Sequence, residues 1–290
     1  MKPLSLLTRS VLATAVISLT ACASVQKTTS EQTTLSNTDK AVAVISSIET
    51  GDAKAISHIN PTQYTQHNLA VKDGLAGFGE VLQQLPKGSA KAQVKRAFSD
   101  GNYTVTHTEY NFFGPKVGFD IFKFENGKII EHWDNLQAIT PVNPSGRTQL
   151  DGATAITDLS KTKANKALVK GFVNTILING NMAKINDFIS SEKGAYIQHN
   201  SAIADDLSGL GKALGELAKL NMSMIVSKNH IILGQGNFVL AVNEGTFMNK
   251  HVSFYDLFRV ENGKIVEHWD TIETIPAKAQ WQNSNGKFGF

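Results

Sequence analysis

Helical spacing of apolar residues gives way to strand alternation twice along this chain of 290 residues. The first helical run contains Ala41, Val44, Ile45 and Ile48, which recur every three or four positions, and Gly51 ends it. A short second helix is predicted over 53–59. A third is predicted from one apolar stripe, formed by Leu75, Phe78, Leu82 and Leu85.

The second half of the chain repeats this order of helices. Its first helix is predicted from Val169, Phe172, Val173 and Ile176, and Gly180 ends the run. A short helix is expected over 182–189. The third helix has its stripe at Leu207, Leu210, Leu214 and Leu217.

Strand patterns follow the helices in both halves. In the first half, residues 103–110, 117–124 and 128–135 alternate apolar and polar side chains. Asn126-Gly127 and Asn262-Gly263 are typical of two-residue hairpin turns, because both positions tolerate positive φ. Helices followed by a run of antiparallel strands predict an α+β fold for each half.

The two halves are also similar in sequence. Residues 125–134 read ENGKIIEHWD and residues 261–270 read ENGKIVEHWD. A second shared motif is YTQHN at 64–68, which corresponds to YIQHN at 196–200. We therefore expect two tandem copies of one domain. The expected organisation is a first repeat at 39–141, a linker at 142–162, a second repeat at 163–276 and a tail at 277–290.

The N-terminus has the features of a bacterial lipoprotein signal peptide over residues 1–22. Lys2 and Arg9 precede the apolar segment 11–19, and Leu-Thr-Ala-Cys ends at Cys22, the only cysteine. An ordinary signal peptide with an incidental cysteine is the alternative. Lipid on Cys22 would anchor the protein to a membrane, with the polar segment 23–38 as a flexible tether. No aspartate follows Cys22, which favours the outer membrane, facing the periplasm, of a Gram-negative host.

Composition narrows the remaining classes of function. The chain is 41% hydrophobic and 18% charged, as in ordinary globular proteins. Its formal net charge of +3 falls to +1 without Lys2 and Arg9, and no run of lysine or arginine predicts a nucleic-acid surface. Neither a metal-binding motif with close ligand spacing nor a cofactor-binding motif is apparent, so we expect no metal and no cofactor.

One aspartate in each repeat is a candidate for chemistry. On the strand pattern, Asp120 shares a face with Phe122 and Phe124, and Asp256 lies in the same place in the second repeat. A carboxylate that faces an apolar cavity acquires a raised pKa and becomes a useful acid or base near neutral pH. The alternative is a structural aspartate that caps a loop or pairs with a buried histidine.

The following strand places a second acid and a histidine together. Alternation puts Ile130, His132 and Asp134 on one face, and Ile129, Glu131 and Trp133 on the other. His268, Trp269 and Asp270 are the second-repeat equivalents. The histidine and the aspartate either reach a shared pocket or form a polar rim, with the tryptophan filling the opposite face.

Three further histidines complete the candidate set. His67 and His199 recur in the QHN motif, where each would close the mouth of a pocket or satisfy backbone groups of a turn. His107 is not repeated, because Val242 takes its place. A reaction that needs His107 would therefore occur in the first repeat alone.

The QHN motif, the strand containing Asp120 and the GKIxEHWD block resemble the SnoaL-like branch of the nuclear-transport-factor-2-like superfamily. This resemblance covers nearly all of both repeats. It implies a cone in which a curved antiparallel sheet is wrapped by about three N-terminal helices around an apolar pocket. It also implies acid–base chemistry of the aldol, cyclase or isomerase type. The matching positions are His67, His107, Asp120, His132, Trp133 and Asp134 in the first repeat, and His199, Asp256, His268, Trp269 and Asp270 in the second.

The sequence leaves three functions open. The first is an enzyme in which Asp120, with His132 or His107, moves a proton on a small hydrophobic carbonyl compound. The second is a lipid-anchored module that binds a small hydrophobic molecule without reaction, and the third is an envelope scaffold. Because single-domain relatives pair through their sheets, we expect the repeats to pair within the chain. Their seam is expected to contain Phe119, Ile121 and Trp133 against Tyr255, Leu257 and Trp269.

Overall fold

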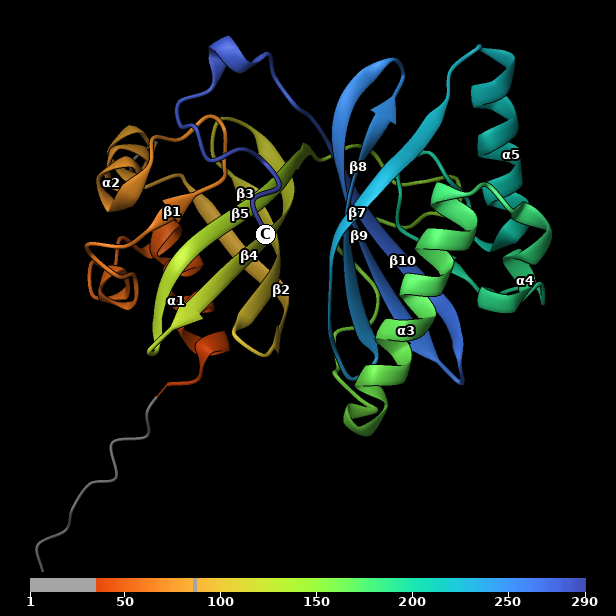
Figure 1. Ribbon diagram of the computed structural model, residues 1–290, viewed down its shortest axis with the longest axis horizontal. Coiled ribbons are helices and arrows are strands. Elements are labelled where there is room, and N and C mark those ends of the chain that lie inside the picture. The colour runs from red at the N-terminus through yellow and green to blue at the C-terminus, as the bar shows by residue number, and fades with distance from the viewer. Residues whose placement is uncertain (1–34, 86–87) are drawn as a thin grey trace, which may run out of the picture. The chain divides into compact units, whose positions relative to one another are not determined.

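The computed structural model describes residues 35–85 and 88–290 (Figure 1). The expected signal peptide, its lipid-bearing Cys22 and most of the expected tether lie outside the described residues. None of the described helices is long and apolar enough to cross a membrane.

The first repeat is an α+β unit with one five-stranded sheet. The helix α1 is capped by Ser36, which accepts a hydrogen bond from the Asp39 amide while the Asp39 carboxylate binds back to Ser36. The sheet order is β1-β5-β4-β3-β2. The elements are α1 (Asn37–Thr50), a 3-10 turn (Ala55–His58), β1 (Thr65–Gln66), α2 (Gly74–Gln84), β2 (Lys91–Asp100), β3 (Tyr103–Asn111), β4 (Pro115–Glu125) and β5 (Lys128–Ala138).

The second repeat has the same architecture, with sheet order β6-β10-β9-β8-β7. Its first helix continues into a π-helical segment, Val173–Ile178. The main elements are α3 (Thr162–Phe172), α4 (Ile185–Phe188), β6 (Ile197–Gln198), α5 (Asp206–Lys219), β7 (Met224–Gln235), β8 (Phe238–Phe247), β9 (Lys250–Glu261) and β10 (Lys264–Thr274). Short 3-10 turns lie at Leu159–Lys161, Met182–Lys184 and Lys278–Gln280.

The α+β fold in two copies is confirmed, and two details of the prediction are corrected. The sheets are mixed, because β1 and β6, from the QHN motifs, pair in parallel with β5 and β10. In addition, the register shifts between Lys123 and Phe124 against β5, so Ile129 packs in the helix-side core and not on the face of Trp133. The hairpin turns are as predicted, with φ of 50° at Asn126 and 73° at Gly127.

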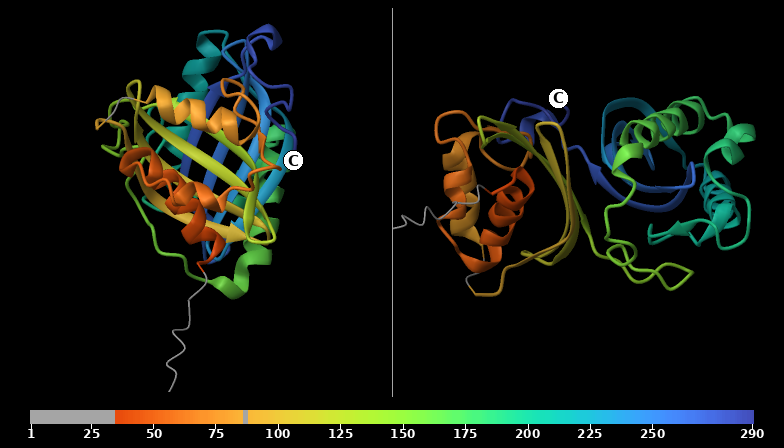
Figure 2. Two further views of the ribbon diagram at one scale, coloured as in Figure 1. Left: turned by 90° about the vertical axis from the view of Figure 1, so that its left-hand side faces the viewer. Right: turned by 90° about the horizontal axis from the view of Figure 1, so that it is seen from below.

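Each sheet has one face under its own helices and the other face toward the other repeat (Figure 2). All six residues that we expected at the seam belong to one cluster that spans both sheets, and each is fully buried. The side chain of Asn135 donates to the Thr271 carbonyl at 2.9 Å. Two reciprocal bonds flank it, from the Leu136 amide to Glu273 at 2.9 Å and from the Ile272 amide to Gln137 at 2.8 Å.

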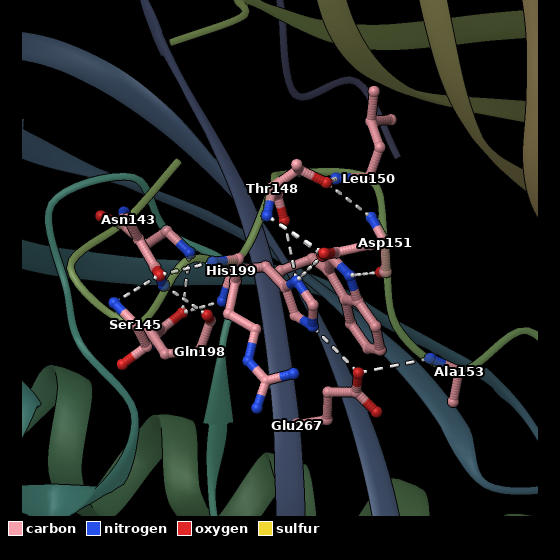
Figure 3. A network of polar contacts seen from close by, with 12 residues as sticks. Asn143, Ser145, Thr148, Leu150, Asp151, Ala153, Gln198, His199 and Glu267 are labelled. Carbon is pink, nitrogen blue, oxygen red and sulfur yellow. Dashed lines mark hydrogen bonds and ion pairs between the residues drawn. The ribbon is translucent and has the colours of Figure 1, made fainter. Parts of the chain in front are cut away.

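The segments that follow β5 and β10 cross to the opposite repeat. We call residues 142–155 the first arm and residues 277–290 the second arm. In the first arm, the Asn143 side chain donates to the Gln198 carbonyl at 2.6 Å, and the Thr148 carbonyl lies 2.8 Å from His199 Nδ1 (Figure 3). The expected linker is therefore a structural part of the second repeat.

The second arm makes the corresponding contacts with the first repeat. The Asn285 side chain donates to the Gln66 carbonyl at 3.0 Å, and the Gly286 carbonyl lies 2.8 Å from His67 Nδ1. Both arms carry an Asn-x-(Ser/Asn)-Gly-(Arg/Lys) sequence, at 143–147 and 283–287, with glycine at φ of 78° and 75°. The arms are thus a further repeated feature, and each repeat is completed by the arm of the other.

Candidate functional site

The three candidate residues of the first sheet's inner strands meet on its helix side. Asp120 on β4 is paired in register with Asp134 on β5, and Phe122 is paired with His132. Their side chains point the same way because strand residues two apart share a face. Asp120 is 3% exposed and Asp134 5%, so both carboxylates point away from solvent.

Asp120 accepts three hydrogen bonds or close polar contacts. His132 Nε2 lies 3.1 Å from one carboxylate oxygen. The other oxygen accepts a bond of 2.6 Å from the Tyr110 hydroxyl and one of 3.2 Å from Thr106. These bonds compensate for the loss of water around a buried charge, which would otherwise be costly.

Gln66 fixes the protonation pattern of His132. Its side-chain oxygen lies 3.0 Å from His132 Nδ1, so Nδ1 carries the hydrogen that Gln66 accepts. Nε2 then shares one proton with Asp120, and the ring stacks on Phe122 with centroids 4.8 Å apart. A proton can therefore move between His132 Nε2 and Asp120 while the hydrogen bond from Nδ1 to Gln66 holds the ring in place.

The second repeat reproduces this arrangement. His268 Nε2 lies 3.1 Å from Asp256, and His268 Nδ1 lies 2.9 Å from the Gln198 side-chain oxygen. Burial disfavours the imidazolium, but the hydrogen bond to Asp256 and the charges of Asp270 and Asp256 outweigh it and raise the pKa of His268. Burial also raises the pKa of Asp270.

An asparagine from the QHN motif holds the outer aspartate of each cluster. Asn68 donates to Asp134 at 2.6 Å, and Asn200 donates to Asp270 at 2.7 Å. In the first repeat alone, the second arm adds a cation to this aspartate, because Lys287 Nζ lies 3.6 Å from Asp134 and 2.8 Å from Glu273.

The polar groups above the central aspartate differ between the repeats. The register places Ala241, Asn243 and Gly245 where the first repeat has Thr106, Thr108 and Tyr110. Asn243 donates to Asp256 at 2.8 Å in place of the missing hydroxyls. A side chain at Gly245 would collide with the Ile225 carbonyl, 1.9 Å from where its Cβ would be, so this site excludes a tyrosine.

His67 and His199 do not join these clusters. They stack on Trp133 and Trp269, with centroids 4.5 and 4.7 Å apart, on the sheet face away from the helices. His199 also lies 2.9 Å from Glu267. Each is one residue past the short parallel strand, so the alternation directs Gln66 and Gln198, and not the histidines, toward the clusters.

His107 also lies apart from the Asp120 cluster. Thr106, and not His107, is in register with Asp120, so His107 faces the seam. There it stacks on Phe119 at 4.3 Å and lies 3.1 Å from the guanidinium of Arg96. Burial and the Arg96 charge hold the pKa of His107 well below its usual range. Trp133 and Trp269 are likewise seam residues, whereas Phe122 does line the cluster side.

Each cluster also has the donor set of a weak metal site. One ligand atom from each of Asp120, His132 and Asp134 lies within 4.8 Å of the others, and the same holds for Asp256, His268 and Asp270. Two carboxylates and an imidazole suit a borderline divalent cation. The sequence spacing showed only the weak His132/Asp134 pair, because the third ligand, Asp120, comes from the neighbouring strand.

Sequence reasoning also missed the residues that orient the histidines and the aspartates. Gln66, Asn68, Gln198 and Asn200 all belong to the repeated YxQHN motif, whose recurrence was the available signal. Tyr110 gave no such signal, because Gly245 takes its place, and Lys287 was missed although the arm sequence that contains it recurs with Arg147.

Two grooves lie on the surface away from the aspartate–histidine clusters, and no residue of either cluster lines them. One, of about 450 Å³, lies between the ends of α1 and α2 in the first repeat and is lined by Ile48, Ile56 and Leu82 among others. The other, of about 650 Å³, lies between α3 and β7 in the second repeat.

No family model matches the chain, and no curated protein matches its sequence. Solved structures similar to part of it include an NTF2-like protein of unknown function from Cytophaga hutchinsonii, with 15% identity, a TM-score of 0.33, and coverage of 37% of this chain and 94% of that one. IdmH from Streptomyces antibioticus, described as a candidate polyketide cyclase, has 14% identity and a TM-score of 0.32, and the match covers 36% of this chain and 93% of IdmH. A cystatin-like fold protein of unknown function from Xanthomonas campestris has 22% identity and a TM-score of 0.33, and the match covers 40% of this chain and 97% of that one.

Proposed function

We propose that each repeat contains a proton-transfer site that acts on a small hydrophobic carbonyl compound. The observation that carries the proposal is a chain of three groups built twice with the same geometry. In each repeat a glutamine oxygen holds histidine Nδ1, and histidine Nε2 lies 3.1 Å from an aspartate. An arrangement with a fixed ring and one shared proton suits general acid–base catalysis.

The proposed reaction moves one proton without net change in the protein. The Asp120 carboxylate takes a proton from the carbon next to the carbonyl, and the His132 imidazolium gives its Nε2 proton to the carbonyl oxygen. Asp120 then returns its proton to His132 across the 3.1 Å contact, which restores the starting pair. The enol formed can close a ring, add to a second carbonyl or isomerise.

The experiment pairs substrate discovery with matched variants. Compounds that co-purify with the protein are identified by mass spectrometry, and apolar ketones and aldehydes are screened for turnover. The double variant Asp120→Asn/Asp256→Asn is expected to lose about two to four orders of magnitude in rate, as is usual when a general base is removed. Turnover that survives in the double variant would reject the proposal, and the two single variants show which repeat contributes.

A binding role without reaction is the second candidate, and a contact in the first repeat favours it there. The Asp120 oxygen that faces away from His132 accepts hydrogen bonds from Tyr110 and Thr106, which a substrate would have to displace before reaching it. This candidate predicts saturable ligand binding with the ligand recovered unchanged.

We also propose that the protein acts in the cell envelope, anchored through lipid on Cys22 and facing the periplasm. The support is the Leu-Thr-Ala-Cys sequence after a short apolar segment. Mass spectrometry of the mature N-terminus should find acyl chains on Cys22, and Cys22→Ala should release the protein from membranes. A mature N-terminus elsewhere would contradict the anchor.

A further inference from the structure

We propose that the groove between α3 and β7 in the second repeat is a separate binding site for a small organic anion with an apolar chain. The groove has a volume of about 650 Å³. Its lining includes the cations Lys166, Lys170 and Lys228 and the apolar residues Ile178 and Ile231. This combination of cationic and apolar side chains suits a carboxylate or phosphate ester on a short hydrocarbon.

The lysines belong to the second repeat only. When the helices are aligned on Ala41/Val169 and Ile45/Val173, Lys166 and Lys170 take the places of Thr38 and Val42. Lys228 pairs with Glu244 in the sheet, as Gln93 pairs with Glu109, so it takes the place of a glutamine. Three neutral positions of one repeat have therefore become cationic in the other, all around one groove.

Both walls of the groove also contain an extra residue. The spacing from Ile45 to Gly51 is six positions, whereas that from Val173 to Gly180 is seven, and the π-helical segment Val173–Ile178 accommodates the difference. β7 has two register irregularities where β2 has one. Single-turn π-helical segments and β-bulges are both frequent at functional sites.

The same changes remove the contacts that close this region in the first repeat. There, Thr38 and Ser99 share a hydrogen bond of 2.7 Å, and Glu49 accepts one of 3.1 Å from the Ala92 amide, so α1 is tied to β2 at both ends. In the second repeat, Ile178 stands in the place of Glu49 and lines the groove. Lys166 instead pairs with Asp100 of the first repeat.

The groove is joined to the Asp256 cluster by two hydrogen bonds. Asn229, which lines the groove, donates to Asn243 at 2.8 Å, and Asn243 donates to Asp256 at 2.8 Å. Both asparagines are specific to the second repeat, because Val94 and Thr108 occupy their places in the first. Two hydrogen bonds therefore connect the groove with Asp256, the aspartate that contacts His268.

Within the part of the chain that the structure describes, two lysines that line the groove form no ion pair. Lys166 is engaged by Asp100, and His230 lies 2.8 Å from Glu244. Lys170 on α3 and Lys228 on β7 are both exposed and both line the groove, so an anionic headgroup bound there has two cations available. Octyl phosphate and octanoate are suitable probes, with inorganic phosphate and octyltrimethylammonium testing the apolar chain and the sign of the charge.

The test is calorimetric titration of the protein, followed by NMR titration of His268. Octyl phosphate should bind saturably, more tightly than inorganic phosphate, and should shift the His268 resonances. Lys170→Gln/Lys228→Gln should weaken it by roughly ten-fold or more, since two charge-assisted contacts are lost. Lys212→Gln/Lys250→Gln, which removes two exposed lysines elsewhere in the same repeat, should leave affinity unchanged.

Vesicles of phosphatidylcholine with and without phosphatidylglycerol distinguish the source of the anion. Lysine-dependent binding to the anionic vesicles but not to octyl phosphate would identify a lipid headgroup, and the reverse would identify a soluble ligand. Absence of saturable binding to any anionic probe would overturn the proposal, as would equal affinity of the two double variants. Binding is measured without turnover, so the outcome does not depend on catalysis at either cluster.

Discussion

The two repeats keep the same histidine–aspartate pair but surround it differently. Tyr110 and Thr106 donate hydroxyls to Asp120, whereas Asp256 receives one asparagine amide and has Gly245 above it. In the first repeat an arm lysine approaches the outer aspartate, and in the second the equivalent Arg147 pairs with Asp205. The comparison separates what the fold requires, which is repeated, from what has been specialised, which is not.

The largest expected losses of stability come from truncating the two seam tryptophans. Trp133→Ala and Trp269→Ala should each lower the free energy of unfolding by about 3–5 kcal/mol, because both side chains are fully buried. Trp269→Ala should cause the larger loss of unfolding free energy, since the Trp269 indole also donates to the Asp151 carbonyl at 2.9 Å and lies under the Arg96 guanidinium. Urea unfolding measures both, and equal losses would mean that these polar contacts contribute nothing.

The arm cations provide the next comparison. Lys287→Met leaves the buried Asp134 and the partly buried Glu273 without their cation and should lower the free energy of unfolding by about 3–5 kcal/mol. Arg147→Met removes a partly exposed ion pair and should cost about 1 kcal/mol or less.

The pH dependence of this pair of variants is a separate check. Burial raises the pKa of Glu273 above its usual 4.5, so its ionisation at higher pH opposes folding, and Lys287 offsets this effect. The loss caused by Lys287→Met should therefore be smallest near pH 4–5 and should grow toward pH 8. A loss that is independent of pH would indicate packing and not charge.

The hydroxyl above Asp120 should have a smaller effect. Tyr110→Phe removes the 2.6 Å bond and leaves one carboxylate oxygen with Thr106 alone, which should cost about 1.5–3 kcal/mol. Asn243→Leu is the matched change above Asp256 in the second repeat. Unfolding curves that do not move for Tyr110→Phe would show that His132 and Thr106 hold Asp120 without a contribution from the tyrosine hydroxyl.

The smallest expected effect is a pH dependence from His268. The pKa of His268 is raised above 6.5, so its contribution to stability is complete below pH 6.5 and is lost as the pH rises through the folded-state value. His268→Asn should remove this decline. Unfolding measured from pH 5.5 to 8.5 tests it, and an unchanged slope in the variant would assign the decline to another group.

Residue patterns predicted the parts of the fold that have regular periods. The paired faces of β4 and β9 followed from strict alternation, which places Asp120 and Asp256 on the helix side. β2 and β7 were not predicted, because register irregularities interrupt their alternation. For the same reason the position of Ile129 was wrong.

The candidate site was predictable where strands are long and not where they are short. His132 and Asp134 lie on an eleven-residue strand, and their shared face was predicted. His67 follows a strand of two residues, which has no period to show that Gln66 would face the cluster instead. The arms could not be assigned from sequence, since their partners are more than 50 residues away along the chain.

The exchange of arms has a consequence for how the protein could be divided. A break just after residue 155 would give two fragments, and each would carry the arm that completes the other fragment while lacking the arm that completes itself. Neither fragment should be stable in isolation, yet a mixture should reassemble, with a midpoint that depends on concentration. In the intact chain that dependence is absent, because the tether between the halves replaces an encounter in solution with a local one.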